Sequence, residues 1–274
     1  MVLLEKKRCV YARPFSYWGS KVKLCPKIVD LASKMIGPNK NKIISPFCGC
    51  AVVELNLAHR WPDKEIVCYD INRHIINFHK HVQQNLQGLQ LLIKELLRRD
   101  VSKALYQTIF LRMKGRTLQD AADWWYCSYF SFNGKVGSFS ASTRPNKINI
   151  KPYPKNIRFI HRDSLSALER LPTPEWKHIF MYVDPPYMLN RQGIVYIRAS
   201  KENQQYLNHK RLFDVLQKCR LHGGSWILSY GCDSNITMYK KFKIIRVKVR
   251  TVKWERSTAT QKQLMLHEYL ILSK

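Results

Sequence analysis

Acidic residues are scarce in this chain. Among 274 residues, 19 Asp and Glu stand against 47 Lys and Arg, which gives a formal net charge of +28. Such a surplus is typical of proteins that bind a polyanion, because each Lys or Arg that meets a phosphate releases a counterion. Hydrophobic residues (45%) and charged residues (24%) are at ordinary globular levels, which excludes a disordered or fibrous protein. We therefore expect a folded protein whose partner is nucleic acid rather than a membrane.

Long apolar runs are missing as well. A membrane span needs about 18 or more consecutive apolar residues, and the apolar stretches here, such as residues 226–228, are far shorter. The N-terminus (MVLLEKKR) carries charges within its first eight residues and lacks the apolar centre of a signal peptide. We expect a cytoplasmic, intracellular protein that is neither secreted nor inserted in a membrane.

The eight cysteines form no CxxC pair. Several lie in apolar runs that suit buried, reduced thiols. Cys48 and Cys50 are close in sequence, but two cysteines alone do not complete a tetrahedral zinc site. The sequence implies neither a disulfide nor a metal ion.

The order of short apolar runs predicts an α/β sheet. Residues 24–36 have the apolar spacing of a helix and end at Gly37–Pro38. Strands are expected at 42–47, 65–70, 158–160, 179–183 and 226–230, and helices at 52–59, 72–99 and 202–221. Residues 243–253 and 266–272 are expected to form an antiparallel pair at one edge. No clean period runs through 101–157, which indicates an insert.

Residues 181–187 (MYVDPPY) place a carboxylate, two prolines and an aromatic ring at the end of an apolar strand. Open α/β sheets bind ligands at this end of their strands. The prolines restrict the backbone, so Asp184 and the carbonyl of Pro185 become two preorganised hydrogen-bond acceptors. Two acceptors that face one point suit an exocyclic NH₂ group, and Tyr187 could stack on its base. A simple loop-starting turn would use the same Asp-Pro-Pro.

These residues, including Pro186, resemble the DPPY motif of the Dam-type (alpha group) DNA adenine-N6 methyltransferases, in particular phage-like members. The motif order is also similar to that of the family, over nearly the whole chain. The resemblance implies a Rossmann-like S-adenosylmethionine-dependent methyltransferase sheet with helices on both faces. Residues 1–75 and 158–274 would form this catalytic domain, and residues 76–157 a helical or hairpin target-recognition insert.

The resemblance also implies S-adenosylmethionine as cofactor. Residues 15–21 (FSYWGSK) resemble an N-terminal element whose Lys meets the cofactor carboxylate. Residues 45–51 (SPFCGCA) resemble a PFxGxG turn that lets the backbone approach the cofactor. The sequence departs at Cys50, where a second Gly is usual, and at Ser45, where Glu is frequent. The positions carried over from these two elements are Tyr17, Gly19, Lys21, Pro46, Phe47 and Gly49.

Three acids complete the expected cofactor site. Asp70 ends a strand about twenty residues after the Gly turn, where dinucleotide-binding folds place the acid that binds the ribose hydroxyls. Asp163 resembles the acid that binds the adenine amino group of the cofactor, although it would equally cap the next helix. Asp184 is expected to border both the cofactor and the target base.

Basic clusters at 6–8, 98–116, 144–158 and 240–256 are expected to flank DNA. In 245–250 (IRVKVR) the charges alternate with β-branched residues, so one strand face is basic; the same lysines could instead protect an edge strand. The aromatic stretch 124–134 ends in Asn-Gly, a tight-turn signal, and resembles the hairpin of the insert. The expected DNA-binding residues are Asn133, Gly134, Lys135, Arg144, Lys248, Arg250 and Arg256.

The predicted reaction moves a methyl group from S-adenosylmethionine directly to N6 of an adenine flipped out of double-stranded DNA. Its catalytic residues are Asp184, Pro185, Pro186 and Tyr187, with no metal and no cysteine. Methylation of N4 of cytosine on the same fold, RNA as the substrate, and an inactive DNA-binding homologue are the alternatives. A cognate restriction endonuclease is an open partner, and the chain is expected to act as a monomer or weak dimer.

Overall fold

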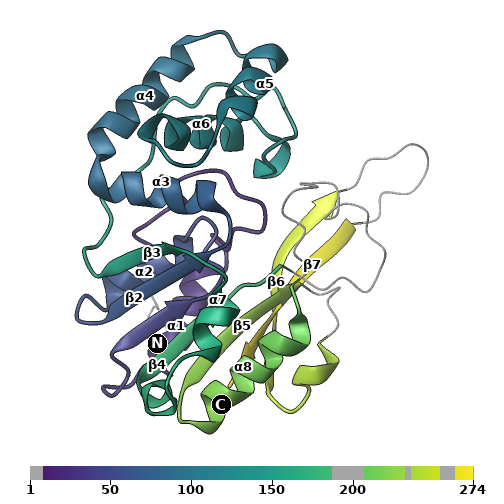
Figure 1. The fold of residues 1–274 in the computed structure, drawn as a ribbon. Coiled ribbons are helices and arrows are strands. Elements are labelled where there is room, and N and C mark those ends of the chain that lie inside the picture. Colours follow the sequence, from purple (N-terminus) through teal and green to yellow (C-terminus); the bar gives the residue numbers. More distant parts are fainter. Residues whose placement is uncertain (1–8, 187–206, 232–235, 254–262, 274) are drawn as a thin grey trace, which may run out of the picture.

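The computed structural model describes residues 9–186, 207–231, 236–253 and 263–273. Figure 1 shows a sheet with helices packed on it and a group of helices at one end. The α-helices are α1 (Cys25–Ser33), α2 (Val52–Arg60), α3 (Arg73–Gln84), α4 (Leu86–Arg98), α5 (Lys103–Arg112), α6 (Leu118–Tyr129), α7 (Ser164–Glu169) and α8 (His209–Leu221). The strands are β1 (Lys42–Ser45), β2 (Glu65–Asp70), β3 (Ile157–His161), β4 (Ile179–Val183), β5 (Ser225–Gly231), β6 (Lys243–Lys253) and β7 (Gln263–Leu272).

The seven strands form one sheet in the order β3-β2-β1-β4-β5-β7-β6. The first five are parallel, whereas β7 runs antiparallel to both β5 and β6. The expected βα alternation and the antiparallel edge pair are therefore confirmed. The chain reverses its strand order beside β1, between β2 and β4, and such a switch point is where α/β sheets open a ligand site.

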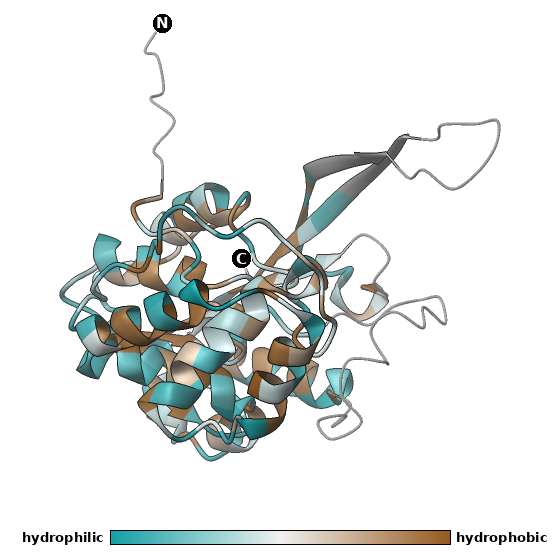
Figure 2. Ribbon diagram, turned by 90° about the horizontal axis from the view of Figure 1, so that it is seen from above, coloured by the Kyte–Doolittle hydropathy of each residue, from teal (hydrophilic) through white to brown (hydrophobic). Residues whose placement is uncertain are grey.

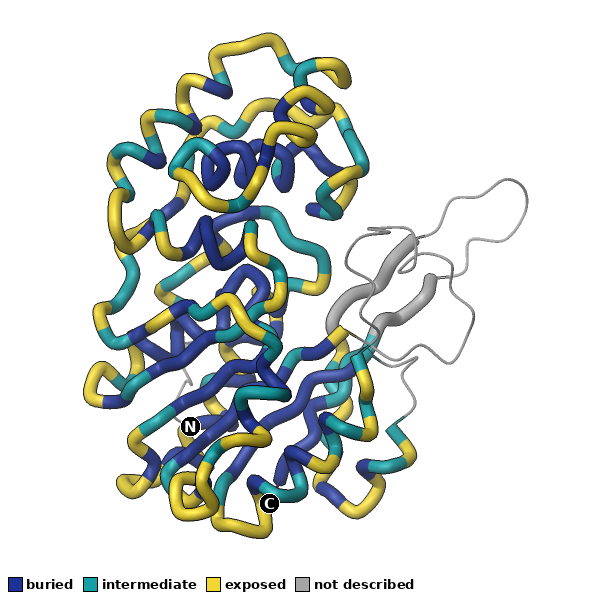
Figure 3. The backbone as a smooth tube through the Cα atoms, viewed as in Figure 1, coloured by how far each residue is buried: buried dark blue, intermediate teal, exposed yellow. Residues whose placement is uncertain are grey.

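Helices cover both faces of the sheet, as predicted. Adjacent strand residues point to opposite faces: Ile43 belongs to the core under α1, α2 and α3, whereas Ile44 belongs to the core under α7 and α8. Phe180 and Met181 divide in the same way. All five residues of β4 are buried, which explains their continuous apolar run. Figure 3 shows the same burial along the central strands.

The segment expected to be an insert is helical. The single helical run predicted for 72–99 is interrupted at Asn85, which ends α3 and caps α4 through a hydrogen bond from the Gly88 N–H. Helices α4, α5 and α6 lie beyond α3, away from the sheet (Figure 1). Figure 2 shows hydrophobic and hydrophilic residues mixed along the helices, as expected of helices that pack on one another.

The hairpin expected in this insert was wrong for most of its length. Residues from Trp124 to Tyr129 lie in α6, and the pairing that follows is a single bridge between Ser131 and Phe139. A capping box of Thr117 and Asp120 starts α6, and the Trp and Tyr side chains then fall at a helical spacing that buries them. The Asn-Gly turn is real, but it follows a helix rather than a strand.

Where the structure describes helices, none is both long and apolar enough to cross a membrane.

Candidate active site

The predicted cofactor residues gather at the carboxyl ends of β1, β2 and β4. Gly49 follows β1, Asp70 ends β2 and Asp184 follows β4. The N-terminal loop closes this edge, because the ring of Tyr17 lies against Gly49 and Lys21 reaches Asp184. Four segments that are far apart in the sequence thus meet at one place.

The turn after β1 needs a glycine at position 49 but not at position 50. Gly49 has φ +47°, and a Cβ there would lie 2.6 Å from Cε1 of Tyr17. Ala51, the residue before α2, is also left-handed at φ +54°. Cys50 is not among the described residues with positive φ, so the departure from glycine at this position costs the backbone nothing. Burial raises the pKa of Cys50 to about 12, which keeps its thiol protonated.

Asp70 is held by two backbone donors. The Gly49 N–H donates to Oδ2 at 3.0 Å, and the Asn72 N–H donates to Oδ1 at 2.8 Å. Burial raises the pKa of Asp70 above its ordinary value, and the two N–H donors oppose that rise. Each carboxylate oxygen keeps a second lone pair, so the side chain can still accept hydrogen bonds from a ligand hydroxyl.

Lys21 is buried between two carboxylates. Its Nζ lies 2.8 Å from Oδ2 of Asp184 and 3.8 Å from Oε2 of Glu268, and it donates to the Gly19 carbonyl at 2.5 Å. Its side chain is 4% exposed. The motif Lys and the motif Asp are therefore an ion pair, and the third partner, Glu268 of β7, is a residue that the sequence analysis missed.

One acid near Lys21 and Asp184 is almost completely buried. Glu54 in the first turn of α2 accepts a 2.6 Å hydrogen bond from the hydroxyl of Ser45, and both side chains are buried. Burial raises the pKa of Glu54 to about 8. Ser45, where the family often has Glu, thus contacts a glutamate that comes from the next helix instead.

The remaining catalytic and cofactor positions divide into three groups. Pro46 and Pro185 are buried, Phe47 is half-buried and packs on the core under α7 and α8, and Pro186 is exposed. Asp163 caps α7, accepting from the Leu165 N–H, and its Oδ2 lies 3.5 Å from Nη1 of Arg211. The capping role that the sequence analysis considered for Asp163 is therefore confirmed. Tyr187 lies outside the described residues.

The predicted DNA-binding residues are spread over three places. Gly134 (φ +74°) packs so closely on the N-terminal loop that a Cβ would lie 2.7 Å from the Ser16 carbonyl carbon. Lys135 Nζ lies 5.3 Å from the centre of the Trp18 ring. Arg144 donates to the Arg99 carbonyl at the far end of α4. The turn of the insert therefore adjoins the cofactor loop, whereas Arg144 does not.

The other basic residues lie on the edge strand. Arg246 and Lys248 of β6 are exposed, while the alternating residues Ile245 and Val247 are partly buried against the core. This alternation confirms the basic strand face over residues 245–248. The side chain of Arg250 and all of Arg256 lie outside what the structure describes.

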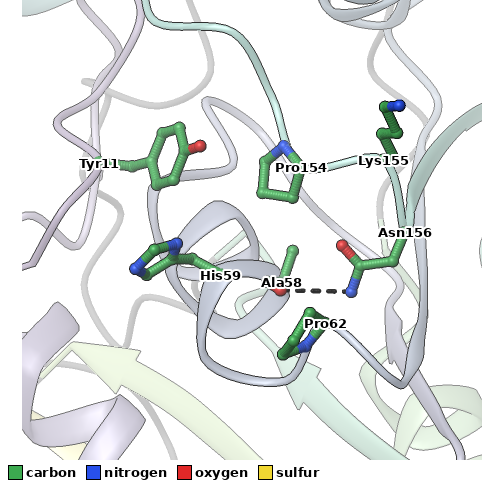
Figure 4. A pocket seen from close by; sticks show the side chains of 7 residues that line it. All are labelled: Tyr11, Ala58, His59, Pro62, Pro154, Lys155 and Asn156. Atoms are coloured by element: carbon green, nitrogen blue, oxygen red, sulfur yellow. Dashed lines mark hydrogen bonds between the residues drawn. The ribbon is translucent and has the colours of Figure 1, made fainter.

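A pocket of about 470 Å³ lies elsewhere, between the end of α2 and the segment leading into β3. Figure 4 shows Tyr11, His59 and Pro154 around it, with the Asn156 side chain hydrogen-bonded to the Ala58 carbonyl. It shares no residue with the group around Asp184. In the part of the chain that the structure describes, no cluster of three His, Cys, Asp or Glu is placed to hold a metal ion.

Comparison with known proteins agrees with this arrangement. Residues 17–252 match the family of D12 class N6 adenine-specific DNA methyltransferases. The chain belongs to this family. It is also 25% identical to the type II methyltransferase M1.LlaDCHI of Lactococcus lactis subsp. cremoris, over 96% of each chain. This D12 class enzyme is thus a DNA methyltransferase that acts on N6 of adenine, and the α/β methyltransferase fold implied by the motifs is confirmed.

Solved structures of other methyltransferases are more distant from this D12 class chain. The precorrin-6y C5,15-methyltransferase of Geobacter metallireducens GS-15 has 9% identity and a TM-score of 0.36, covering 94% of this chain and 89% of that one. The rRNA methyltransferase aviRa of Streptomyces viridochromogenes has 12% identity and a TM-score of 0.37, covering 97% and 90%.

Proposed function

We propose that this enzyme transfers the methyl group of S-adenosylmethionine directly to N6 of an adenine flipped out of double-stranded DNA. The observation that carries this proposal is the buried ion pair of Lys21 and Asp184, at 2.8 Å, beside the Gly49 turn and Asp70. Together these residues provide a fixed acceptor for the substrate amine next to a polar site for the cofactor.

Asp184 and the carbonyl of Pro185 accept hydrogen bonds from the two amino protons of adenine. With both protons bound, the nitrogen lone pair points away from the two acceptors, toward the methyl group. Asp184 can accept the proton that N6 loses as its bond to carbon forms, while the electron pair of the broken methyl–sulfur bond stays on the sulfur of the cofactor. Lys21 holds the Asp184 carboxylate in place, so little reorganisation is needed when adenine arrives. The step needs no enzyme nucleophile, and the thiols of Cys48 and Cys50 are kept protonated by burial, which raises the pKa of each.

The residues around Gly49 fit S-adenosylmethionine. Asp70 retains lone pairs for the ribose hydroxyls, and the Gly49 backbone is free of a Cβ at a place where one would collide with Tyr17. Lys21, Gly19, Pro46 and Phe47 border the same turn. When bound, the cofactor supplies an electrophilic methyl group on a sulfonium centre. Asp163, which follows β3, is assigned by the resemblance to the adenine amino group of the cofactor, in addition to capping α7.

The insert and the β6–β7 edge are proposed to hold the DNA. The register of β5 with β7 pairs Gly231 with Glu268, so residues of β7 before Glu268 extend past the carboxyl end of β5. The β6–β7 pair therefore extends beyond the edge of the sheet where Asp184 lies. The insert reaches the N-terminal loop of this site through Gly134. Figure 1 shows the strand pair and the insert helices. We assign catalysis to residues 1–75 and 158–274, and target recognition to residues 76–157, with Asn133, Lys135, Arg144, Lys248, Arg250 and Arg256 on the DNA side.

One chain carries the acceptors Asp70, Asp184 and the Pro185 carbonyl together with Lys21, so we propose that a monomer is sufficient for the reaction. The relative from Lactococcus lactis is named a type II methyltransferase, and by that similarity we assign this enzyme to a restriction-modification pair with a cognate endonuclease, acting on DNA inside the cell.

The proposal is tested by incubating the enzyme with methyl-labelled S-adenosylmethionine and unmethylated DNA, native or heat-denatured. Digestion to nucleosides and mass spectrometry should find labelled N6-methyladenine, formed faster on native DNA. Label on adenine in denatured DNA alone would overturn the assignment of a duplex substrate, and no dependence on S-adenosylmethionine would overturn the donor.

A further inference from the structure

His79 of α3 connects the cofactor turn to the segment by which the chain returns from the insert. The side chain is fully buried, with Nε2 at 2.8 Å from the carbonyl oxygen of Gly49 and Nδ1 at 2.9 Å from the hydroxyl of Tyr153. Its ring stacks on Phe159 of β3, with centroids 4.2 Å apart and an interplanar angle of 10°. None of the motifs that define the site includes His79 or Tyr153.

The two partners fix which nitrogen carries the proton. A carbonyl oxygen only accepts, so Nε2 must donate to Gly49 and carry the hydrogen. In a neutral ring Nδ1 is then an acceptor, and the Tyr153 hydroxyl donates to it. Burial lowers the pKa of His79 to about 4, so the ring is neutral near pH 7. The Gly49 carbonyl thus sets the tautomer, and the Tyr153 hydroxyl, from outside the cofactor turn, satisfies the acceptor nitrogen that this tautomer leaves.

Both peptide groups of Gly49 are held by this arrangement. Its N–H donates to Asp70, and its carbonyl accepts from His79. Gly49 is left-handed at φ +47°, and glycine visits that region as one of several backbone conformations. A residue with so much freedom keeps one orientation only when its neighbours hold it. His79 therefore holds the carbonyl of Gly49, as Asp70 holds its N–H.

We propose that His79 is a positioning residue for the S-adenosylmethionine turn, and that Tyr153 supports its Nε2–H form by donating to Nδ1, so the return segment of the insert influences cofactor affinity. The inference rests on the proposed cofactor site at Gly49 and Asp70. It assigns to the insert a role in cofactor binding besides DNA recognition. The residues act through the turn, so they should change the affinity for the cofactor and leave the transfer step at saturation nearly unchanged.

Three variants separate the hydrogen bonds from the packing. His79→Phe keeps a ring that can stack on Phe159 but removes the donor to Gly49. His79→Gln removes the ring and restores an amide N–H donor at a similar reach. Tyr153→Phe deletes only the hydroxyl that donates to Nδ1. The matched control is Tyr11→Phe, because the Tyr11 hydroxyl donates to the Pro152 carbonyl on the same segment, at 3.0 Å, without touching His79.

Direct titration of S-adenosylmethionine into each protein by calorimetry is the primary measurement. We expect the Kd to rise at least about tenfold in His79→Phe, which corresponds to about 1.4 kcal/mol, and about threefold in Tyr153→Phe. His79→Gln should recover much of the loss, and Tyr11→Phe should match the wild type. At saturating cofactor the kcat of each variant should stay within about threefold of the wild type, which a general loss of structure would not allow.

Nitrogen NMR of the His79 ring gives a readout that needs no cofactor. The wild type should show a neutral ring protonated at Nε2, and in Tyr153→Phe the Nδ1 resonance should shift because its hydrogen bond is lost. A wild-type ring protonated at Nδ1 would overturn the proposal, and so would unchanged Kd values in folded His79→Phe and Tyr153→Phe. Failure of the wild type itself to bind S-adenosylmethionine would instead count against the proposed cofactor.

Discussion

The Nζ of Lys21 lies 2.8 Å from Oδ2 of Asp184, joining the first and last segments of the active site in a buried ion pair. We expect Lys21→Met, which keeps the apolar stem and removes the charge, to lower kcat at least about 100-fold, because Asp184 loses the partner that orients it. Lys21→Arg should retain part of the rate. Single-turnover methylation assays at saturating cofactor measure both, and wild-type turnover in Lys21→Met would contradict this role.

The turn at Gly134 should be the least tolerant glycine of the insert. A Cβ there would lie 2.7 Å from backbone atoms of both Ser16 and Tyr17, and the φ of +74° is unfavourable for any other residue. Gly134→Ala should therefore lower the free energy of unfolding by about 2 kcal/mol or more. Gly37→Ala is the matched control, since nothing lies within 4 Å of its Cβ position, and it should be neutral or stabilising by up to about 1 kcal/mol. Urea denaturation compares the two, and equal effects would contradict the close approach.

Glu54 should make stability depend on pH. Its pKa is raised from 4.5 to about 8 by burial, so the folded state binds a proton that the unfolded state releases. The stability from this group is fully present below pH 4.5 and is lost as the pH rises through 8, by about 5 kcal/mol in all on the order-of-magnitude linkage relation.

Glu54→Gln keeps the acceptor for Ser45 and removes the titration. Denaturation of both proteins from pH 5.5 to 8.5 should show the wild type losing stability relative to Glu54→Gln as the pH rises. Burial of His79, which lowers its pKa to about 4, acts in the opposite direction below pH 6.5 but equally in both proteins. A constant difference between the two proteins would show that Glu54 is ionised throughout.

The exposed face of β6 should contact DNA phosphates. Lys248→Ala removes one charge from that face, so the slope of log K against log salt concentration for duplex binding should fall by about 0.9. The control is Lys34→Ala at the C-cap of α1, where the lysine pairs with Asp30 at 3.4 Å. Fluorescence anisotropy at several salt concentrations measures the slopes. An unchanged slope for Lys248→Ala would mean that Lys248 only protects the edge strand.

The sheet was predictable because its central strands are short, continuous apolar runs ended by Gly, Pro or Asp. Asp70 and Asp184 followed from that pattern, since carboxyl ends of parallel strands share one edge, whereas Gly49 was implied by the resemblance to the PFxGxG turn. The prediction for the insert was wrong from Trp124 to Tyr129, because aromatic residues are compatible with both strands and buried helices. The capping box at Thr117, which starts α6, favours the helix. Asn-Gly at 133–134 correctly predicted a turn, but the dipeptide does not indicate whether a helix or a strand precedes that turn.

Partners contributed by distant segments could not be read from the sequence. Glu268 reaches Lys21 because β7 lies between β5 and β6 in the sheet. The spacing of residues in the sequence does not predict this strand order. In the sequence, His79 does not differ from other polar residues of an amphipathic helix. Its contacts appear only when α3 packs on β3. Ser45 differs from the Glu that is frequent at this position of the motif. Its hydrogen-bond partner, Glu54, could be identified only from the packing of α2.

The most direct test of the account compares Asp184→Ala and Asp70→Ala, because Asp184 is assigned to the adenine amine and Asp70 to the cofactor. Calorimetric titration of S-adenosylmethionine and nucleoside mass spectrometry of methylated DNA are measured on both. Asp184→Ala should form N6-methyladenine at least about 1,000-fold more slowly than the wild type, with a cofactor Kd within about threefold of it. Asp70→Ala should bind the cofactor at least about tenfold more weakly and recover turnover at high concentration. Normal turnover in Asp184→Ala, or an unchanged cofactor Kd in Asp70→Ala, would contradict the division of roles.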